Sequence, residues 1–339
     1  MDYSKILKDA KVDVIFLFNS MEKPDSNFTY MTKHTNLDGV FELSKNKKMY
    51  VSPLEIGNVK SKKNNFEVLE LNKEFYDSLN KKFKGKRVGL NYNYLSVNGF
   101  NSLKRKLDAK FVDVSGILEE KRKTKSYEEI EKISRACSIT DIVFEKIFSE
   151  AKECKTEIGL KNLIHDLMRE HNVEESFDTI VASGKNSAVP HHISNNTKLK
   201  GMTIIDTGVI YENYCSDVSR TLFFGNPKKE EKNNYSKLLS VQKDCIKMVG
   251  ENSSFSEIQK YSKDKLGKSF IHSIGHGLGI DVHEMPFANE NKLKEGNVIT
   301  IEPGIYFPKK YGIRIEDDVL VLKNGNRVLS KADKEMVIL

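Results

Sequence analysis

The chain has 339 residues, of which 38% are hydrophobic and 30% are charged, and its formal net charge is +7. This length allows two domains that each bury a core, and the composition is typical of a soluble globular protein. The excess positive charge comes from lysines scattered over the whole chain without a DNA- or RNA-binding motif, so we expect a solvated lysine-rich surface and no nucleic-acid partner.

The sequence contains no segment that predicts export or membrane insertion. Its first residues include acidic side chains and lack the apolar core of a signal peptide. The most apolar early run, Val12 to Phe18, is too short to span a bilayer, so we expect no membrane partner. The four cysteines form no CxxC pair, which favours reduced thiols and a cytoplasmic location.

Residues 1–120 alternate short helices and strands, which is the pattern of an α/β layer arrangement. Apolar periodicity and turn residues predict helices over residues 4–10, 74–83 and 94–107. The predicted strands cover residues 12–18, 39–43, 48–52, 87–90 and 110–114, and the second and third of them form a hairpin. Because this region has no cluster of metal-ligand residue types, we interpret it as a structural and substrate-gating domain.

A domain boundary is predicted near residues 121–130, where a new helix begins. Ser126 and Glu129 form a capping box, and an apolar stripe of period 3.6 extends this helix to about Ala151. Thr156 is the predicted N-cap of a second helix. This second helix covers residues 157–171, and two further predicted helices cover residues 230–249 and 255–266.

A polar loop follows the strand predicted over residues 177–182. Its sequence is SGKNSAVPHH, and it ends in His191 and His192. Pro190 restricts the backbone that leads into the two histidines. The next two strands form a predicted hairpin that brings Asp206 and Asp217 close together.

Four carboxylates lie in or beside short β-branched runs that are typical of strands, namely Asp206, Asp217, Glu302 and Glu316. Burying such a charge without a partner is costly. The stretch from His272 to Glu284, HSIGHGLGIDVHE, adds three histidines among glycines, which let a backbone approach a ligand closely. Four carboxylates and one histidine provide mainly oxygen ligands, enough for two divalent ions such as Mn²⁺, Co²⁺, Fe²⁺ or Zn²⁺.

In their order and spacing, five of these residues resemble the ligand set of the pita-bread metallopeptidases: Asp206, Asp217, His276, Glu302 and Glu316. The histidine stretch, SGKNSAVPHH, EPGIY and GIRIEDD resemble the proline-specific branch, which comprises Xaa-Pro dipeptidases (prolidases) and aminopeptidases P. The resemblance implies a catalytic α/β domain of two similar halves over residues 121–339. It also implies a smaller creatinase-like α/β domain over residues 1–120.

The resemblance also implies how the ligands are shared. Asp217 and Glu316 bridge two ions, Asp206 completes one ion, and His276 with Glu302 completes the other. The expected ions are Mn²⁺ or Co²⁺, with Zn²⁺ and Fe²⁺ as alternatives. A hydroxide between the metals would attack the scissile carbonyl, with Glu302 as the general base.

Further side chains are expected around the substrate. By resemblance, His191 and His283 contact the substrate and the transition state, and His272 lines the pocket. Arg314 is expected on the same strand face as Glu316, where it positions Glu302 or the substrate carboxylate. Tyr306 either assists the bridging water or packs, and the role of His192 is left open.

The sequence therefore predicts a cytoplasmic, homodimeric Xaa-Pro dipeptidase. The alternative within the branch is an aminopeptidase P, which removes the first residue from longer peptides. A methionine aminopeptidase is disfavoured because such enzymes commonly lack the N-terminal domain. A non-catalytic pita-bread binding module is disfavoured because such relatives lose metal ligands, and all five candidate ligands are present here.

Overall fold

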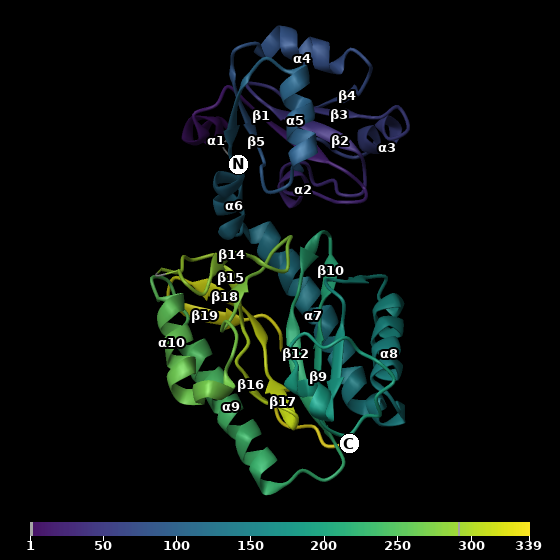
Figure 1. The fold of residues 1–339 in the computed structure, drawn as a ribbon, viewed down its shortest axis with the longest axis vertical. Coiled ribbons are helices and arrows are strands. Elements are labelled where there is room, and N and C mark those ends of the chain that lie inside the picture. Colours follow the sequence, from purple (N-terminus) through teal and green to yellow (C-terminus); the bar gives the residue numbers. More distant parts are fainter. Residues whose placement is uncertain (1–2, 291) are drawn as a thin grey trace. The chain divides into compact units, whose positions relative to one another are not determined.

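The computed structural model describes residues 3–290 and 292–339 (Figure 1). The chain divides into two compact units, an N-terminal unit, Met1–Arg122, and a C-terminal unit, Lys123–Leu339. The predicted domain boundary between residues 120 and 121 lies close to this division. Within the described residues, no helix combines the length and the apolar character that crossing a bilayer would require.

The N-terminal unit is built on one six-stranded sheet with the order β4-β3-β2-β1-β5-β6. The strands are β1 (Val14–Asn19), β2 (Gly39–Leu43), β3 (Lys47–Val51), β4 (Glu67–Glu70), β5 (Arg87–Leu90) and β6 (Lys110–Asp113). Strand β2 pairs antiparallel with β1 and β3, and the remaining neighbours are parallel. The helices are α1 (Tyr3–Ala10), α2 (Ser26–Thr32), α3 (Ile56–Ser61), α4 (Phe75–Phe83), α5 (Val97–Lys106) and α6 (Ser115–Lys123).

The predicted hairpin of β2 and β3 is confirmed, and α5 is shorter than predicted. Ser96 Oγ accepts a hydrogen bond from the Gly99 amide, so this helix begins at Val97 rather than at residue 94. Helices α2, α3 and α6 and strand β4 were not predicted. The three shortest of them, with four to seven residues each, contain at most two apolar periods, which is too few to separate a pattern from chance.

The first half of the C-terminal unit packs two helices against an antiparallel sheet with the order β12-β9-β8. Its elements are α7 (Tyr127–Glu150), α8 (Glu157–Glu170), β7 (Glu174–Glu175), β8 (Ile180–Ser183), β9 (Gly201–Thr207), β10 (Val209–Tyr211), β11 (Tyr214–Cys215) and β12 (Val218–Phe224). The predicted capping box of Ser126 and Glu129 at the start of α7 is confirmed, as is the Thr156 cap of α8. Apolar residues of both helices share one buried cluster with β8, β9 and β12.

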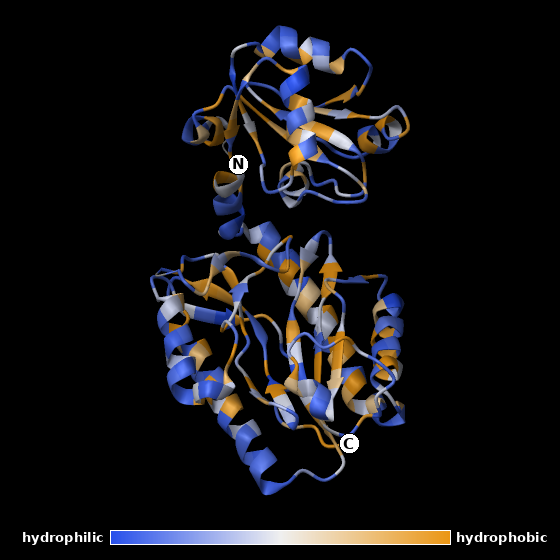
Figure 2. Ribbon diagram, in the orientation of Figure 1, coloured by the Kyte–Doolittle hydropathy of each residue, from blue (hydrophilic) through white to orange (hydrophobic). Residues whose placement is uncertain are grey.

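The second half packs two helices against a five-stranded sheet with the order β14-β13-β15-β18-β19. Its elements are α9 (Lys229–Met248), α10 (Phe255–Leu266), β13 (His276–Gly277), β14 (Glu284–Phe287), β15 (Val298–Ile301), β16 (Gly304–Phe307), β17 (Tyr311–Arg314), β18 (Asp317–Leu322) and β19 (Gly325–Val328). Strands β9 and β12 mix hydrophobic and hydrophilic residues, whereas α9 carries many hydrophilic residues (Figure 2). The α/β fold class predicted for both parts of the chain is confirmed.

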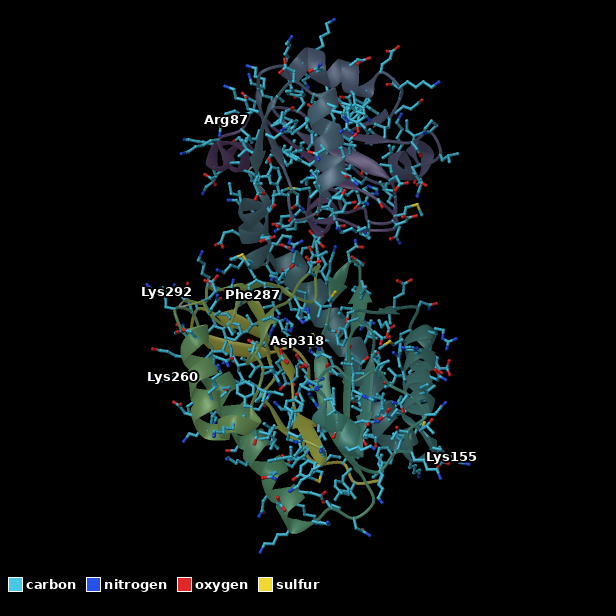
Figure 3. The ribbon with its side chains drawn as sticks, in the orientation of Figure 1. Arg87, Lys155, Lys260, Phe287, Lys292 and Asp318 are labelled. Atoms are coloured by element: carbon cyan, nitrogen blue, oxygen red, sulfur yellow. The ribbon has the colours of Figure 1, made fainter. Side chains whose placement is uncertain are left out.

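The interior of the C-terminal unit is unusually rich in charge for a core. Lys155 and Lys260 point outward at its periphery, whereas Asp318 lies inside it and is fully buried (Figure 3). Buried carboxylates need nearby donors or cations. The donors and cations that surround these buried carboxylates therefore mark the region where the two halves of the C-terminal unit meet.

Candidate metal centre

The five predicted ligands come from both halves of the C-terminal unit. Asp206 is in β9, and Asp217 directly precedes β12, which pairs antiparallel with β9. His276 begins β13. Glu302 directly follows β15, and Glu316 lies between β17 and β18. Three of the four carboxylates therefore lie beside strands, where the backbone can turn the side chain toward a common point.

The structure brings all five side chains together. His276 Nε2 lies 3.4 Å from Glu302 Oε1 and 3.7 Å from Asp217 Oδ2. One set of ligand atoms within 4.8 Å of each other comprises His276, Glu302 and Glu316, and a second comprises Asp206, Asp217 and Glu316. A third set joins Asp217, His276 and His283. Because Glu316 belongs to both of the first two sets, the geometry suits two adjacent ions that share a carboxylate.

The chemistry of this cluster fits divalent cations. Burial is the main cause that raises the pKa of Asp217 and Glu316 well above their usual values, and repulsion from neighbouring carboxylates is the second cause. Burial raises the pKa of Glu302 to about 8. Burial, together with the neighbouring His283, lowers the pKa of His276 to about 4, so this imidazole is neutral and can act as a ligand. Among the described residues, the buried Asp217 Oδ1 has no hydrogen-bond partner, as expected of an oxygen that is placed to bind a cation.

Ser219 was not predicted to belong to the site, yet its hydroxyl lies at the centre of it. Its side chain is fully buried, and Oγ lies 2.7 Å from Asp206 Oδ1 and 2.8 Å from Glu316 Oε2. Arg314 Nε donates to the same oxygen at 2.8 Å. The hydroxyl therefore lies within hydrogen-bond distance of a carboxylate from each half of the unit. Ser219 follows Asp217 by two residues, and residues two apart in a strand share a face. Only this spacing could have indicated the role of Ser219.

Arg314 also lies at the centre, and of the two expected partners, Glu302 and the substrate carboxylate, the first is replaced by Asp206. Its Nη2 donates to Asp206 Oδ2 at 2.6 Å rather than to Glu302, and its Nη1 donates to the Tyr306 hydroxyl at 2.9 Å. That hydroxyl lies 2.9 Å from His272 Nε2. The Arg314 guanidinium, which is buried, therefore fixes Asp206 and Tyr306 at once.

The direction of the hydrogen bonds at His272 follows from its second ring nitrogen. Nδ1 lies 2.7 Å from the Ser273 carbonyl, which can only accept, so Nδ1 carries a proton. Burial, assisted by the positive charge of Arg314, lowers the pKa of His272 to about 4 and keeps the ring neutral. Nε2 therefore accepts a hydrogen bond from the Tyr306 hydroxyl. Because that hydroxyl also accepts from Arg314, Tyr306 links the orientation of the His272 ring to that of the guanidinium.

A cavity of about 490 Å³ opens onto the cluster. All five predicted ligands line it, and so do four other predicted side chains: His191, His272, His283 and Arg314. Tyr306 is buried, accepts a hydrogen bond from Arg314 and is not part of the lining. The apolar wall was not predicted and comprises Phe177, Ile180, Pro190, Val282 and Phe287. Apolar residues give no sequence signal that separates a cavity wall from a core.

His192, whose role the sequence left open, does not line the cavity. Its Nε2 lies 2.8 Å from Glu157 Oε2, at the start of α8. The carboxylate of Glu157 is fully buried. His192 therefore anchors the loop between β8 and β9, whereas the neighbouring His191 faces the cavity.

Two glycines of the histidine stretch allow a close approach to neighbouring backbone segments. A β-carbon on Gly275 would lie 2.0 Å from the carbonyl oxygen of Thr300, and one on Gly277 would lie 2.3 Å from the Met285 backbone. Both distances are far below van der Waals contact. Any side chain at these positions would displace His276 from the metal centre.

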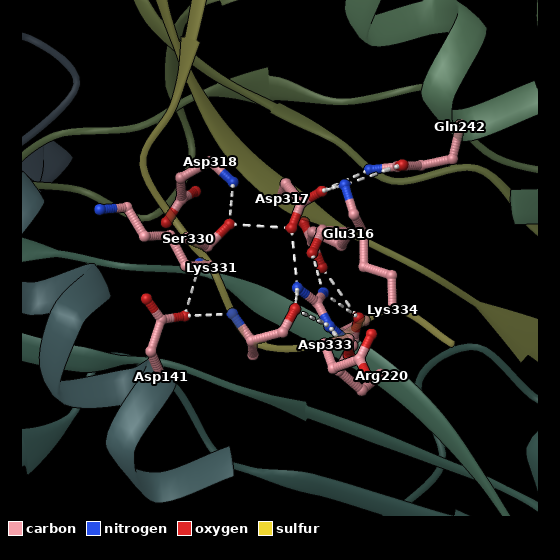
Figure 4. A network of polar contacts seen from close by, with 12 residues as sticks. Asp141, Arg220, Gln242, Glu316, Asp317, Asp318, Ser330, Lys331, Asp333 and Lys334 are labelled. Carbon is pink, nitrogen blue, oxygen red and sulfur yellow. Dashed lines mark hydrogen bonds and ion pairs between the residues drawn. The ribbon is translucent and has the colours of Figure 1, made fainter. Parts of the chain in front are cut away.

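A buried ion network fixes the backbone next to Glu316 (Figure 4). Arg220 is 1% exposed, and its Nη1 donates to the Glu316 carbonyl while its Nη2 donates to Asp317 Oδ1. Gln242 Nε2 and Lys334 Nζ each donate to Asp317 Oδ2 at 2.6 Å. Although burial would raise the pKa of Asp317, the charges of Arg220 and Lys334 hold it below its usual value.

Comparisons with known proteins agree with this architecture. Residues 131–323 match the family model of metallopeptidase family M24, and residues 3–124 match that of the creatinase/prolidase N-terminal domain. A Xaa-Pro dipeptidase from Pyrococcus horikoshii is 35% identical over 303 residues, which cover 85% of each chain.

Solved structures of similar proteins extend over the whole chain. A Xaa-Pro dipeptidase from Bacillus anthracis has a TM-score of 0.91 and 29% identity, covering 99% of this chain and 98% of that one. An X-Pro aminopeptidase from Thermotoga maritima has a TM-score of 0.91 and 28% identity, covering 99% of this chain and 100% of that one. The similarity therefore includes both units.

Proposed function

Because the chain belongs to metallopeptidase family M24, we propose that it hydrolyses Xaa-Pro peptide bonds with two divalent metal ions and that Xaa-Pro dipeptides are its preferred substrates. The single observation that carries this proposal is the pair of ligand sets that share Glu316 and line the cavity. The name of the 35% identical relative supports the choice of substrate.

The metal ligands proposed are Asp206, Asp217, His276, Glu302 and Glu316. When bound, two divalent ions would supply a bridging hydroxide near neutral pH and would polarise the scissile carbonyl. Asp217 and Glu316 are the ligands proposed to be shared by both ions, which is supported by the membership of each in two of the three ligand sets. Glu302, which lines the cavity beside His276, is the proposed general base because the family resemblance places the equivalent glutamate beside the attacking water.

The remaining polar groups of the cavity bind and orient the substrate. His191 and His283 are exposed side chains of the cavity wall and are the proposed contacts to the substrate carbonyl and its developing negative charge. Arg314 keeps Asp206 in place and presents positive charge toward the substrate carboxylate. Tyr306 and His272 hold the guanidinium in that orientation.

The test is hydrolysis of Xaa-Pro dipeptides beside Xaa-Pro-Yaa tripeptides by metal-stripped protein, with and without added Mn²⁺ or Co²⁺. We expect metal-dependent cleavage of the dipeptides. The Asp206→Asn variant should lose activity because the amide removes one anionic ligand while it keeps the shape of the side chain. An unchanged hydrolysis rate in this variant would exclude the metal mechanism.

A second function has a specific observation in its favour. The structural similarity to an X-Pro aminopeptidase is as high as that to a dipeptidase. Faster cleavage of the tripeptides than of the dipeptides would assign the chain to this function. Cleavage of neither substrate class by metal-loaded protein would exclude both.

We further propose Mn²⁺ or Co²⁺ as the native ions, with Zn²⁺ and Fe²⁺ as alternatives, because the ligand set is rich in oxygen. A cytoplasmic location is proposed because all four cysteines are free thiols. A homodimer is proposed from the family resemblance. Metal analysis of native protein, cell fractionation and light scattering test these three points.

A further inference from the structure

The loop between β8 and β9 carries His191, and no polar contact of the described residues fixes the His191 side chain. Among the described residues its imidazole makes no hydrogen bond and no ion pair. The ring is exposed and lines the cavity. Its position relative to the metal centre therefore depends on the backbone on either side of it.

Both neighbours of His191 are anchored. The carbonyl of Pro190 accepts a hydrogen bond from Arg314 Nη1 at 3.4 Å. The His192 ring donates to Glu157 Oε2 at 2.8 Å. The first contact is long, and the second is short and goes to a buried carboxylate, so the second is the stronger restraint.

Glu157 collects hydrogen bonds from along this loop. Its Oε1 accepts from the Ser183 amide at 2.8 Å and from Asn186 Nδ2 at 2.9 Å. Its Oε2 accepts from the Asn195 amide at 3.1 Å, in addition to His192. The four donors span residues 183–195, so a single carboxylate ties both ends of the loop segment to one point.

The placement of this carboxylate is costly unless its partners are present. Glu157 is fully buried and is the first residue of α8, where the positive end of the helix dipole stabilises a negative charge. Backbone bonds from Glu157 and Ile158 to Thr197 and Asn195 attach the same helix end to the loop. The start of α8 and the loop therefore form one rigid piece.

We propose that Glu157 is a positioning residue that acts through His192 and the loop backbone to hold His191 over the metal centre. The inference rests on the proposed function of His191 in peptide hydrolysis. In the part of the chain that the structure describes, Glu157 and His192 make no hydrogen bond to the proposed metal ligands and do not line the cavity. Their contribution to the reaction is the position of His191.

The test combines two variants in a double-mutant cycle, Glu157→Gln and His191→Ala. In Glu157→Gln the new amide group faces the Asn195 N–H, another donor, so the loop loses at least one hydrogen bond. We expect kcat for the Xaa-Pro dipeptide to fall about tenfold in the wild-type background and to change less than about twofold in the His191→Ala background. An equal loss in both backgrounds would overturn the proposal, since Glu157 would then act independently of His191.

The matched control is His165→Gln, because His165 also lies on α8 and also contacts a carboxylate, Glu175, at 3.0 Å. This variant should retain the wild-type kcat. Calorimetric titration of the metal-stripped proteins with Mn²⁺ should give the same affinity for both variants and the wild type. A weaker Mn²⁺ affinity in Glu157→Gln alone would show that the substitution disturbs metal binding rather than the position of His191, and would overturn the proposal.

A second measurement does not depend on activity. Hydrogen exchange should be faster over residues 184–198 in Glu157→Gln than in His165→Gln, and equal rates would overturn the proposal. If neither substrate is cleaved by wild-type protein, the proposed function fails while this measurement still tests the loop anchor. If Glu157→Gln does not fold, His192→Ala replaces it in both experiments, because its ring is near the surface and water can enter.

Discussion

At the scale of single residues, the Ser219 hydroxyl links the two halves of the metal centre. It has one proton and cannot donate to Asp206 and Glu316 at the same time, while Arg314 donates to its oxygen. We expect Ser219→Ala to weaken Mn²⁺ binding by about 10- to 100-fold, since groups that orient metal ligands have effects of this size. Ser219→Thr keeps the hydroxyl and should bind nearly as well in calorimetric titrations. Equal affinities for Ser219→Ala and wild type would contradict this role.

Protonation of the same centre predicts how stability depends on pH. Burial raises the pKa of Glu302 from 4.5 to about 8, so the folded metal-free protein holds this proton where the unfolded chain has released it. More protons are then bound in the folded state, and its stability falls as the pH rises. The pKa values of His272 and His276 are lowered from 6.5 to about 4, so between these two pH values the unfolded chain binds more protons. In that range these histidines make stability rise with pH, and above pH 6.5 they have no such effect.

We therefore expect chelator-treated protein to lose stability between about pH 6.5 and about pH 8. Metal-loaded protein should lose less, because the ions replace the protons on the carboxylates. Urea denaturation of both forms across this range measures the difference, with Glu302→Gln as the variant that should reduce the slope. A stability that rises with pH in the metal-free form would exclude this interpretation.

The identity and spacing of the five candidate ligands could be recognised in the sequence because each is a chemically distinctive residue in a distinctive segment. Ser219 and Glu157 could not be recognised in the same way. A serine in a strand and a glutamate in the first turn of a helix are common for local reasons. Only the approach of β17 to β12, and of the loop to α8, gives these two residues their partners.

At the scale of elements, the start of α7 offers a direct test of a local prediction. The Ser126 side chain accepts from the Glu129 amide, and the Glu129 side chain accepts from the Ser126 amide. We expect Ser126→Ala to lower the free energy of unfolding by about 1 kcal/mol. The control is Ser138→Ala on an exposed turn of the same helix, which should change stability by less than about 0.5 kcal/mol in urea denaturation. Similar losses in both variants would show that the cap does not determine stability.

The long amphipathic elements were predictable and the short ones were not. The stripe of α7 extends over 24 residues, so its period is unambiguous. Helix α3 has six residues and one buried side chain, and it forms where the tertiary structure covers Val59. The irregular backbone at Asp217 and Glu316 also has no local signal, because it is set by the meeting of two sheets.

At the scale of the whole molecule, each unit has its own buried cluster, and all five candidate ligands lie in Lys123–Leu339. We therefore expect two unfolding transitions in calorimetry, of which added Mn²⁺ raises only one. At a free ion concentration about 100 times Kd, the stabilisation is about 2.7 kcal/mol. Limited proteolysis identifies which unit unfolds in each transition. A metal-induced increase in both transitions would contradict independent unfolding.

The Arg220 network also has a consequence for the order in which the chain is made. Asp317 follows Arg220 by 97 residues, and Ala332, whose carbonyl accepts from the same guanidinium, follows it by 112. During synthesis, the first half of the C-terminal unit therefore emerges with a cation that has none of these distant partners. Its strand β12 cannot bury Arg220 with its partners until the later segment has been translated, so completion of the first half awaits synthesis of the chain as far as Ala332.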